Sequence, residues 1–241
     1  MSDLRQPIQD LVIANRILAR EGVLDGFGHV TIRHPDNPEH YFMSCSRGPE
    51  LVRREDIVEF TLQGEPINQN GRALYAERAI HGSIYAARPD VMAVCHNHSP
   101  SVIPFGITRT PLRPVLHMAA LIGPEVPLWD IRDDFGDTNL LVTTLEQGGS
   151  LARTLGDKRM ALMRGHGSVV VGVSLKEVVM ASVYLEVNAK LQLQALGLGA
   201  EINYLTPGEI EGCQEMLIHP NYPSLDRAWE YWRSRAGYPG I

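Results

Sequence analysis

The 241-residue sequence has few cysteines, no excess of positive charge and no long apolar run. Cys45, Cys95 and Cys213 are an odd number without the spacing of a zinc finger, which argues against a disulfide framework. The net charge is −6 and the basic residues are scattered, so we expect no nucleic-acid or anionic-membrane surface. No apolar run approaches the roughly 20 residues that span a bilayer. The start, MSDLRQPIQD, lacks a basic-then-apolar signal, so a reducing cytoplasm is the expected location.

The sequence also lacks internal repeats and low-complexity linkers. Its apolar fraction of 44% is enough to bury a core, and we predict a single domain over residues 1–241. Helical and strand-like patterns alternate irregularly, with hairpin-like strand pairs, which favours an α/β domain with helices on both faces of a mixed sheet. The clearest predicted helices are 7–21, 145–155 and 175–196, and the clearest strands are 30–33, 41–44, 57–62, 91–98, 159–163 and 169–171.

The remaining patterns are weaker. Residues 126–129 and 140–143 are predicted strands, and residues 130–136 between them a charged loop. A helix is expected from Arg72 onward, and a short one at 114–122.

Residues 91–98 are an apolar run that ends in two histidines with one residue between them. Side chains alternate faces along a strand, so His96 and His98 are expected to point the same way. Two imidazoles on one face at a strand end can supply half of a metal site. On this pattern alone, they could equally be polar residues that close a strand at the surface.

A third histidine, His166, lies between two glycines and between two strand-like runs. Glycines allow turns that are closed to other residues and let the backbone come close to a ligand. We therefore predict that His166 completes a three-histidine site with His96 and His98. Three neutral imidazoles leave a divalent ion with an open position for substrate or water, which is typical of catalytic sites.

Glu77 lies upstream of these histidines in a helix-like segment. Together with H-N-H-S at 96–99, G-H-G at 165–167 and D-G-F-G-H-V-T at 25–31, it forms a pattern that resembles the class II aldolase/adducin family. The similarity covers about residues 7–200. The family includes fuculose-phosphate aldolase, ribulose-phosphate epimerase, methylthioribulose-phosphate dehydratase, and decarboxylases of hydroxylated aromatic and pyridine dicarboxylates.

The resemblance implies a three-layer α/β/α fold with a central mixed, largely antiparallel sheet, and a homotetramer with active sites at subunit interfaces. It implies one divalent ion per subunit, with Zn, Mn, Fe and Co all open. The ion would stabilise negative charge on two adjacent substrate oxygens, while Glu77 would give or take the proton. The alternative for Glu77 is a solvated glutamate on a helix.

The same resemblance points to residues that would contact a small-molecule substrate. His29 lies in a glycine-rich turn predicted at residues 25–29. Ser44, Ser46 and Arg47 lie where the family places substrate contacts. This loop could also be a plain solvated turn. Arg132 aligns loosely with a catalytic tyrosine that a neighbouring subunit supplies in the aldolases, and it is a further candidate.

The expected anion pocket argues against a sugar phosphate. Phosphate-handling members carry two serines just before the glutamate, where this chain has Tyr75 and Ala76. They also carry an asparagine where this chain has His29. Two parts of the phosphate cradle are therefore missing, and residues 25–35 instead resemble the aromatic decarboxylase branch.

Three functions stay open at this point. The favoured one is metal-dependent decarboxylation of a hydroxylated aromatic or heteroaromatic (di)carboxylate, such as a dihydroxyphthalate, in aromatic catabolism. Aldol cleavage or dehydration of a small hydroxy-keto substrate is the alternative. A non-enzymatic, adducin-like interaction module is the third, although such a module should have lost the metal ligands. Release of CO2, rather than an aldehyde or water, would separate the first two.

Overall fold

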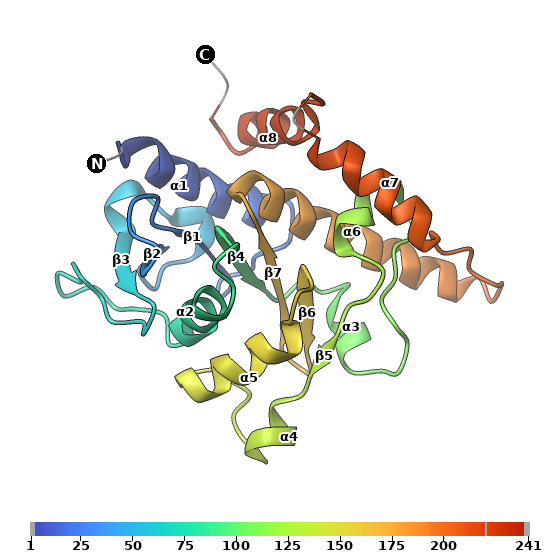
Figure 1. Cartoon of the computed structure of the whole chain (residues 1–241), viewed down its shortest axis with the longest axis horizontal. Helices are drawn as coiled ribbons and strands as arrows, with labels where there is room; N and C mark the ends of the chain where they lie inside the picture. The colour runs from blue at the N-terminus through green and yellow to red at the C-terminus, as the bar shows by residue number, and fades with distance from the viewer. Residues whose placement is uncertain (1–2, 220, 239–241) are drawn as a thin grey trace.

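A seven-stranded sheet forms the centre of the molecule (Figure 1). The computed structural model describes residues 3–219 and 221–238, so the two ends of the predicted domain 1–241 lie outside the described residues. The strand order is β3-β2-β1-β4-β7-β6-β5. The strands are β1 His29–Arg33, β2 His40–Ser44, β3 Ile57–Thr61, β4 Ala93–Asn97, β5 Leu128–Trp129, β6 Met160–Met163 and β7 Gly167–Gly172.

The sheet is mixed and largely antiparallel, as predicted. β5 and β6 run parallel, whereas the other neighbouring strands pair antiparallel. The pairing of β1 with β4 sets His29 opposite His96, and the pairing of β4 with β7 sets His96 opposite Val169. The register therefore brings the glycine-rich turn, the histidine pair and the third histidine to one end of three adjacent strands.

Helices cover both faces of this sheet, which confirms the three-layer prediction (Figure 1). In β4, Ala93 and Cys95 pack into the apolar core beneath α1 (Arg5–Arg20) and α6 (Leu175–Gly197). Val94 packs into the core beneath α2 (Arg78–Ala87) and α5 (Leu145–Leu155). None of the helices in the described ranges is both long and apolar enough to cross a membrane. The α-helices are α1 Arg5–Arg20, α2 Arg78–Ala87, α3 Ile103–Gly106, α4 Ile131–Phe135, α5 Leu145–Leu155, α6 Leu175–Gly197, α7 Pro207–Ile218 and α8 Ser224–Arg235.

The helix predicted from Arg72 starts six residues later, and this correction matters for the site. α2 begins at Arg78, and Glu77 is its N-cap residue with φ −90° and ψ 27°. The Glu77 carboxylate is bonded to a backbone N–H in another loop and does not cap its own helix. The prediction of a helix up to Glu77 was wrong because this long-range bond leaves no mark in the local sequence.

Two further corrections concern the chain between β4 and α5. The predicted strand 140–143 is irregular, because Leu140 has a positive φ of 67° that interrupts an extended backbone. The predicted charged loop is the short helix α4, whose N-cap Asp130 accepts a hydrogen bond from the backbone N–H of Arg132. The helix expected at 114–122 is a 3-10 helix over His117–Ile122.

Candidate active site

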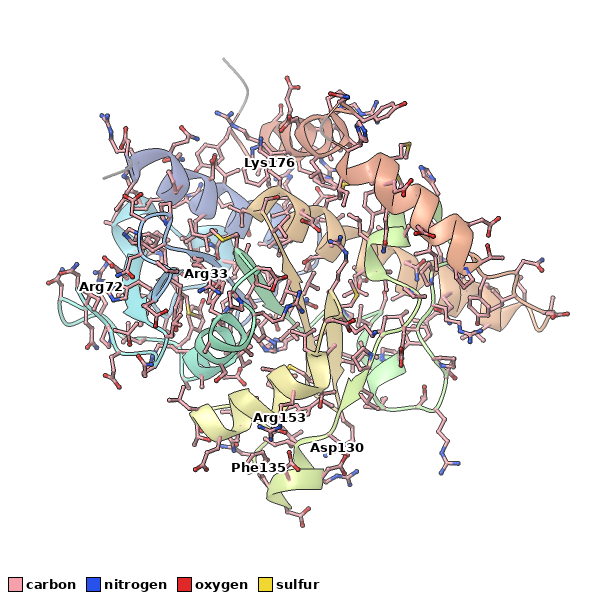
Figure 2. The ribbon with its side chains drawn as sticks, in the orientation of Figure 1. Arg33, Arg72, Asp130, Phe135, Arg153 and Lys176 are labelled. Atoms are coloured by element: carbon pink, nitrogen blue, oxygen red, sulfur yellow. The ribbon has the colours of Figure 1, made fainter. Side chains whose placement is uncertain are left out.

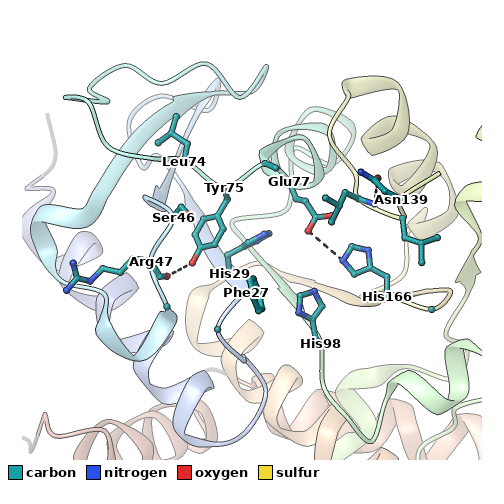
Figure 3. Close-up of a pocket in the computed structure, with 16 residues that line it drawn as sticks. Phe27, His29, Ser46, Arg47, Leu74, Tyr75, Glu77, His98, Asn139 and His166 are labelled. Atoms are coloured by element: carbon teal, nitrogen blue, oxygen red, sulfur yellow. Dashed lines mark hydrogen bonds and ion pairs between the residues drawn. The ribbon is translucent and has the colours of Figure 1, made fainter.

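A cavity of about 680 Å³ opens where the glycine-rich turn meets the ends of β4 and β7 (Figure 3). Segments far apart in the sequence form its walls, and its polar end carries Glu77, His98 and His166. His96 lies fully buried directly behind them. The lining comes from residues 26–29, 46–48, 74–77, 139–141 and 165–166, together with His98.

Three imidazoles and one carboxylate converge at the polar end of this cavity. The Nε2 atoms of His96 and His98 are 3.1 Å apart. Glu77 Oε2 lies 3.7 Å from His96 Nε2 and 3.6 Å from His166 Nε2. One donor atom from each of these four residues lies within 4.8 Å of the others. The predicted same-face pair and the third histidine therefore do come together.

Hydrogen bonds behind the rings set the direction of two of these histidines. The Nδ1–H of His96 donates to the Ser168 carbonyl at 3.1 Å, and the Nδ1–H of His98 donates to Asp25 Oδ1, also at 3.1 Å. A neutral imidazole carries one N–H, so both Nε2 atoms then present lone pairs to each other. Such outer partners are typical of metal-ligating histidines.

This donor set fits a divalent cation. Two lone pairs at 3.1 Å repel each other unless a proton or a cation lies between them. Three imidazoles suit Zn, Fe and Co, and the nearby carboxylate also suits Mn. His96, His98 and His166 are therefore a possible metal site, with the cavity on its open side.

Glycine next to His166 makes this convergence possible. A Cβ atom at Gly167 would lie 2.1 Å from the Asn97 carbonyl oxygen and 3.0 Å from the His98 ring. Only glycine lets β7 approach β4 so closely at the third histidine, as the sequence predicted. On the other side, Gly165 has a φ of 64°, which turns the chain into the cavity wall.

Glu77 is a buried, ionised carboxylate. Burial raises the pKa of Glu77, but the neighbouring His166 and His96 rings and the Val142 N–H outweigh it and lower the pKa to about 2. The Val142 N–H donates to Glu77 Oε1 at 2.9 Å, which leaves Oε2 facing the histidines. The side chain is held by the protein and is free to accept a proton at one oxygen.

His29 lies at the cavity wall and is almost completely buried. Its ring centroid is 4.7 Å from that of Tyr75 and 5.1 Å from that of His96. Burial and the neighbouring histidine His81 hold the pKa of His29 well below its usual range. His29 is therefore neutral at physiological pH and offers one N–H and one lone pair.

With this geometry established, comparisons with known proteins identify the family. The model of the class II aldolase and adducin N-terminal domain matches residues 9–193. The chain belongs to the class II aldolase and adducin family.

Relatives in this family include decarboxylases and aldolases. Decarboxylase tropJ of Talaromyces stipitatus is 32% identical, over 94% of this chain and 92% of its own length. A 3,4-dihydroxyphthalate decarboxylase of Arthrobacter keyseri is 25% identical over 83% of each chain. The solved L-fuculose 1-phosphate aldolase of Glaciozyma antarctica has a TM-score of 0.77 at 25% identity, covering 97% of this chain and 91% of that one. Decarboxylases and aldolases are lyases, and the similarity to them shows that this chain is a lyase as well.

The substrate-binding residues predicted from the family pattern are only partly at the cavity. His29, Ser46 and Arg47 line it, whereas Ser44 is buried in β2 and lies outside the lining. The Arg47 Nε donates to the Leu51 carbonyl at 2.8 Å and lies 3.3 Å from Asp56 Oδ2. Figure 3 accordingly shows the Arg47 guanidinium turned away from the histidines.

Arg132 is not brought to the cavity of its own chain. Its guanidinium pairs with Asp130 at 2.8 Å, at the start of α4, where Figure 2 shows Asp130 and Phe135. The predicted role of Arg132 in a neighbouring subunit's site stays a prediction.

Two residues near the site, Asp25 and His81, were not predicted from the sequence. Asp25 accepts a hydrogen bond from His98 and also from the backbone N–H groups of Phe27 and Gly28, so it connects the glycine-rich turn to the histidine cluster. The aspartate that opens the D-G-F-G turn was a visible signal for the turn, but not for His98, 73 positions away. His81, which binds His29, left no signal because it looks like any helix residue.

Proposed function

We propose that this chain is a metal-dependent decarboxylase of a hydroxylated aromatic or heteroaromatic (di)carboxylate, such as a dihydroxyphthalate, and acts in aromatic catabolism. The observation that carries this proposal is the character of the cavity wall beside the histidines. Tyr75 and Ala76 line it where phosphate-handling relatives need hydroxyls. Phe27, Leu74 and Leu140 add apolar surface. Such a wall suits a planar ring better than a sugar phosphate.

Four groups would divide the chemistry at the polar end of the cavity. His96, His98 and His166 would hold one divalent ion, with Zn, Mn, Fe and Co as candidates. When bound, the ion would stabilise negative charge on adjacent hydroxyl oxygens of the substrate. Glu77 would handle the proton rather than hold the ion: its Oε1 is bonded to the Val142 N–H, and its Oε2 faces the histidines.

Glu77 would carry the proton. With a pKa of about 2 the carboxylate is ionised at neutral pH, so it first accepts the proton of a substrate hydroxyl. It then returns that proton to the ring carbon that bears the carboxylate. The bond from this carbon to the carboxylate breaks, CO2 leaves, and its bonding electrons restore the aromatic ring. The product phenolate regains a proton from water on release.

The substrate carboxylate would be held on the side of His29 and the 46–48 loop. His29 can donate one hydrogen bond, and the exposed hydroxyl of Ser46 another. Arg47 would bind a second carboxylate only after its guanidinium turns from Leu51 and Asp56 toward the cavity. The planar donors of a guanidinium match a carboxylate, which is the reason to keep Arg47 in this role.

Aldol cleavage or dehydration of a small hydroxy-keto substrate is the second candidate. The observation that favours it is the similarity over 97% of the chain to an L-fuculose 1-phosphate aldolase. An ion held by the same three histidines would supply charge stabilisation at adjacent substrate oxygens, and Glu77 would move the proton.

The proposal includes a homotetramer with active sites at subunit interfaces, in the cytoplasm. The exposed ring of Phe27 at the cavity mouth would be covered by a neighbouring subunit. Three unpaired cysteines suit a reducing compartment. Light scattering on the purified chain tests the assembly, and a mass of one or two chains would refute it.

A panel of substrates tests the reaction. Metal-loaded enzyme is incubated with dihydroxybenzoates, dihydroxyphthalates and hydroxypyridine dicarboxylates, and with fuculose and ribulose phosphates. We expect CO2 from an aromatic acid and no aldehyde from the sugar phosphates, and the Glu77→Gln variant serves as a matched control. Faster turnover of a sugar phosphate, or no CO2 from any aromatic acid, would favour the aldolase alternative.

A further inference from the structure

A hydrogen-bonded series of four buried polar residues leads from the cavity wall into the core. His29 Nδ1 lies 2.7 Å from His81 Nε2, and His81 Nδ1 lies 2.8 Å from the Thr31 hydroxyl. That hydroxyl in turn lies 2.8 Å from the Tyr85 hydroxyl. His81 is fully buried and lies behind His29 as seen from the cavity, so substrate does not reach it.

This hydrogen-bonded series holds its four side chains in place but does not conduct protons. Thr31, His81 and Tyr85 are each 1% exposed or less, so the inner end does not reach water. Arg33 fixes that end, since it donates to the Tyr85 carbonyl at 2.7 Å and its guanidinium lies 4.7 Å from the Tyr85 ring centroid. A proton that entered at His29 could not leave at Tyr85. The remaining role for this hydrogen-bonded series is to orient His29.

Orientation includes the choice of which His29 nitrogen carries the proton. Burial lowers the pKa of His81 to about 3, so this ring is neutral and has one N–H. The Thr31 hydroxyl has one hydrogen, and the acceptors within its reach include His81 Nδ1 at 2.8 Å and the Val94 carbonyl at 3.4 Å. If it donates to the nearer of these two, His81 Nδ1, the N–H of His81 is at Nε2 and donates to His29 Nδ1. His29 then carries its own proton at Nε2, the nitrogen left for a ligand in the cavity.

The opposite direction of donation would turn the His29 lone pair toward the ligand. A carboxylate has only acceptor oxygens, so it would be repelled by that lone pair and bound by an N–H. The two directions therefore give opposite responses to an anionic ligand, and the partner of His29 decides between them.

We propose that His81 is a positioning residue that keeps His29 protonated at Nε2, so that His29 donates a hydrogen bond to the carboxylate of the substrate. The inference rests on the proposed function for the identity of the ligand. The tautomer of His29 can be measured without any substrate. The proposed role of His81 can therefore be wrong while the proposed decarboxylation is right, and the decarboxylation can be wrong while the role of His81 is right.

The first test is ¹⁵N NMR of the histidine rings in the Zn²⁺-loaded wild-type protein, with the His29 signals assigned from a His29→Gln variant. We expect His29 protonated at Nε2 and unprotonated at Nδ1. A His29 protonated at Nδ1 would overturn the proposal.

The second test compares two isosteric amides. Glutamine at position 81 places an amide near the former Nε2 and can still donate to His29, whereas asparagine places it near the former Nδ1 and serves only Thr31. Phthalate, which has carboxylates alone, and catechol, which has hydroxyls alone, are the probes for calorimetry on the Zn²⁺-loaded proteins.

We expect His81→Asn to weaken phthalate binding by about 10-fold or more, as for a lost hydrogen bond to a charged group. Catechol binding should change by less than about twofold, and His81→Gln should restore phthalate binding. Equal weakening of both probes, or no difference between the two amides, would reduce His81 to a structural residue and overturn the proposal. If His81→Asn does not fold, the NMR result on the wild-type protein decides alone.

Discussion

Two groups of histidines lie next to each other in this protein and are used in opposite ways. In the group proposed to bind a metal ion, His96 and His98 are hydrogen bonded at Nδ1, and their Nε2 atoms face each other at 3.1 Å without a donor between them. In the positioning group, His29 and His81 face each other at 2.7 Å, and each ring nitrogen between them and Thr31 has a partner.

The difference shows that the outer partners decide what a buried imidazole does. A carboxylate or carbonyl behind the ring fixes the proton there and turns a lone pair toward a cation. A hydroxyl or a second imidazole completes a neutral hydrogen-bonded chain, which tolerates burial because its groups are satisfied.

Removing a metal ligand should have the largest effect. His166→Ala should lower turnover by roughly 10³-fold or more, since an ion supplies several kcal/mol of charge stabilisation. His117→Ala, at an exposed histidine, is the matched control and should leave turnover unchanged. Wild-type turnover in the His166→Ala protein would show that the cluster is not the catalytic centre.

Changing the proton carrier should come next. Glu77→Gln keeps the shape of the side chain but cannot accept a proton, so kcat should fall by roughly 10²-fold or more. Metal content should stay near that of the wild type, which separates this variant from a ligand variant. A variant that loses the ion instead would make Glu77 a metal ligand.

The two groups of histidines differ in how far they could be predicted from the sequence. His96, His98 and His166 could be predicted, because strand alternation and flanking glycines are local patterns. His81 and Asp25 could not, because their partners lie 52 and 73 positions away in the sequence. The central sheet and long helices followed from periodicity, whereas the helix start after Glu77 and the irregular segment 140–143 depend on one long-range hydrogen bond and a positive φ.

A substitution of the outer carboxylate should weaken the metal site without removing it. Asp25→Asn can still accept the N–H groups of the glycine-rich turn but loses the charge behind His98. Its metal affinity should fall by about 10- to 100-fold, as for other outer partners of ligating histidines. A competition titration against a chelator measures this. An unchanged affinity would mean that Asp25 serves only the turn.

The most selective effect, comparable in size to that of Asp25→Asn, is expected at the cavity wall. Arg47→Ala should raise KM for a dicarboxylate more than for its monocarboxylate analogue. The difference in lost binding free energy between the two substrates should be about 1.5–3 kcal/mol, as for a hydrogen bond to a charged group. Arg53→Ala, at a nearby arginine outside the cavity lining, is the control. Equal effects on the two substrates would mean that Arg47 keeps its bonds to Leu51 and Asp56 when substrate binds.

The central claim is that the three imidazoles hold one catalytic divalent ion, and elemental analysis tests it most directly. Wild-type protein and a His96→Ala variant are loaded with excess metal, freed of unbound ions by gel filtration, and analysed in parallel with a His81→Gln variant. The account predicts one ion per chain in the wild-type and His81→Gln proteins, and a strong loss in His96→Ala. Wild-type metal content in the His96→Ala protein would contradict it.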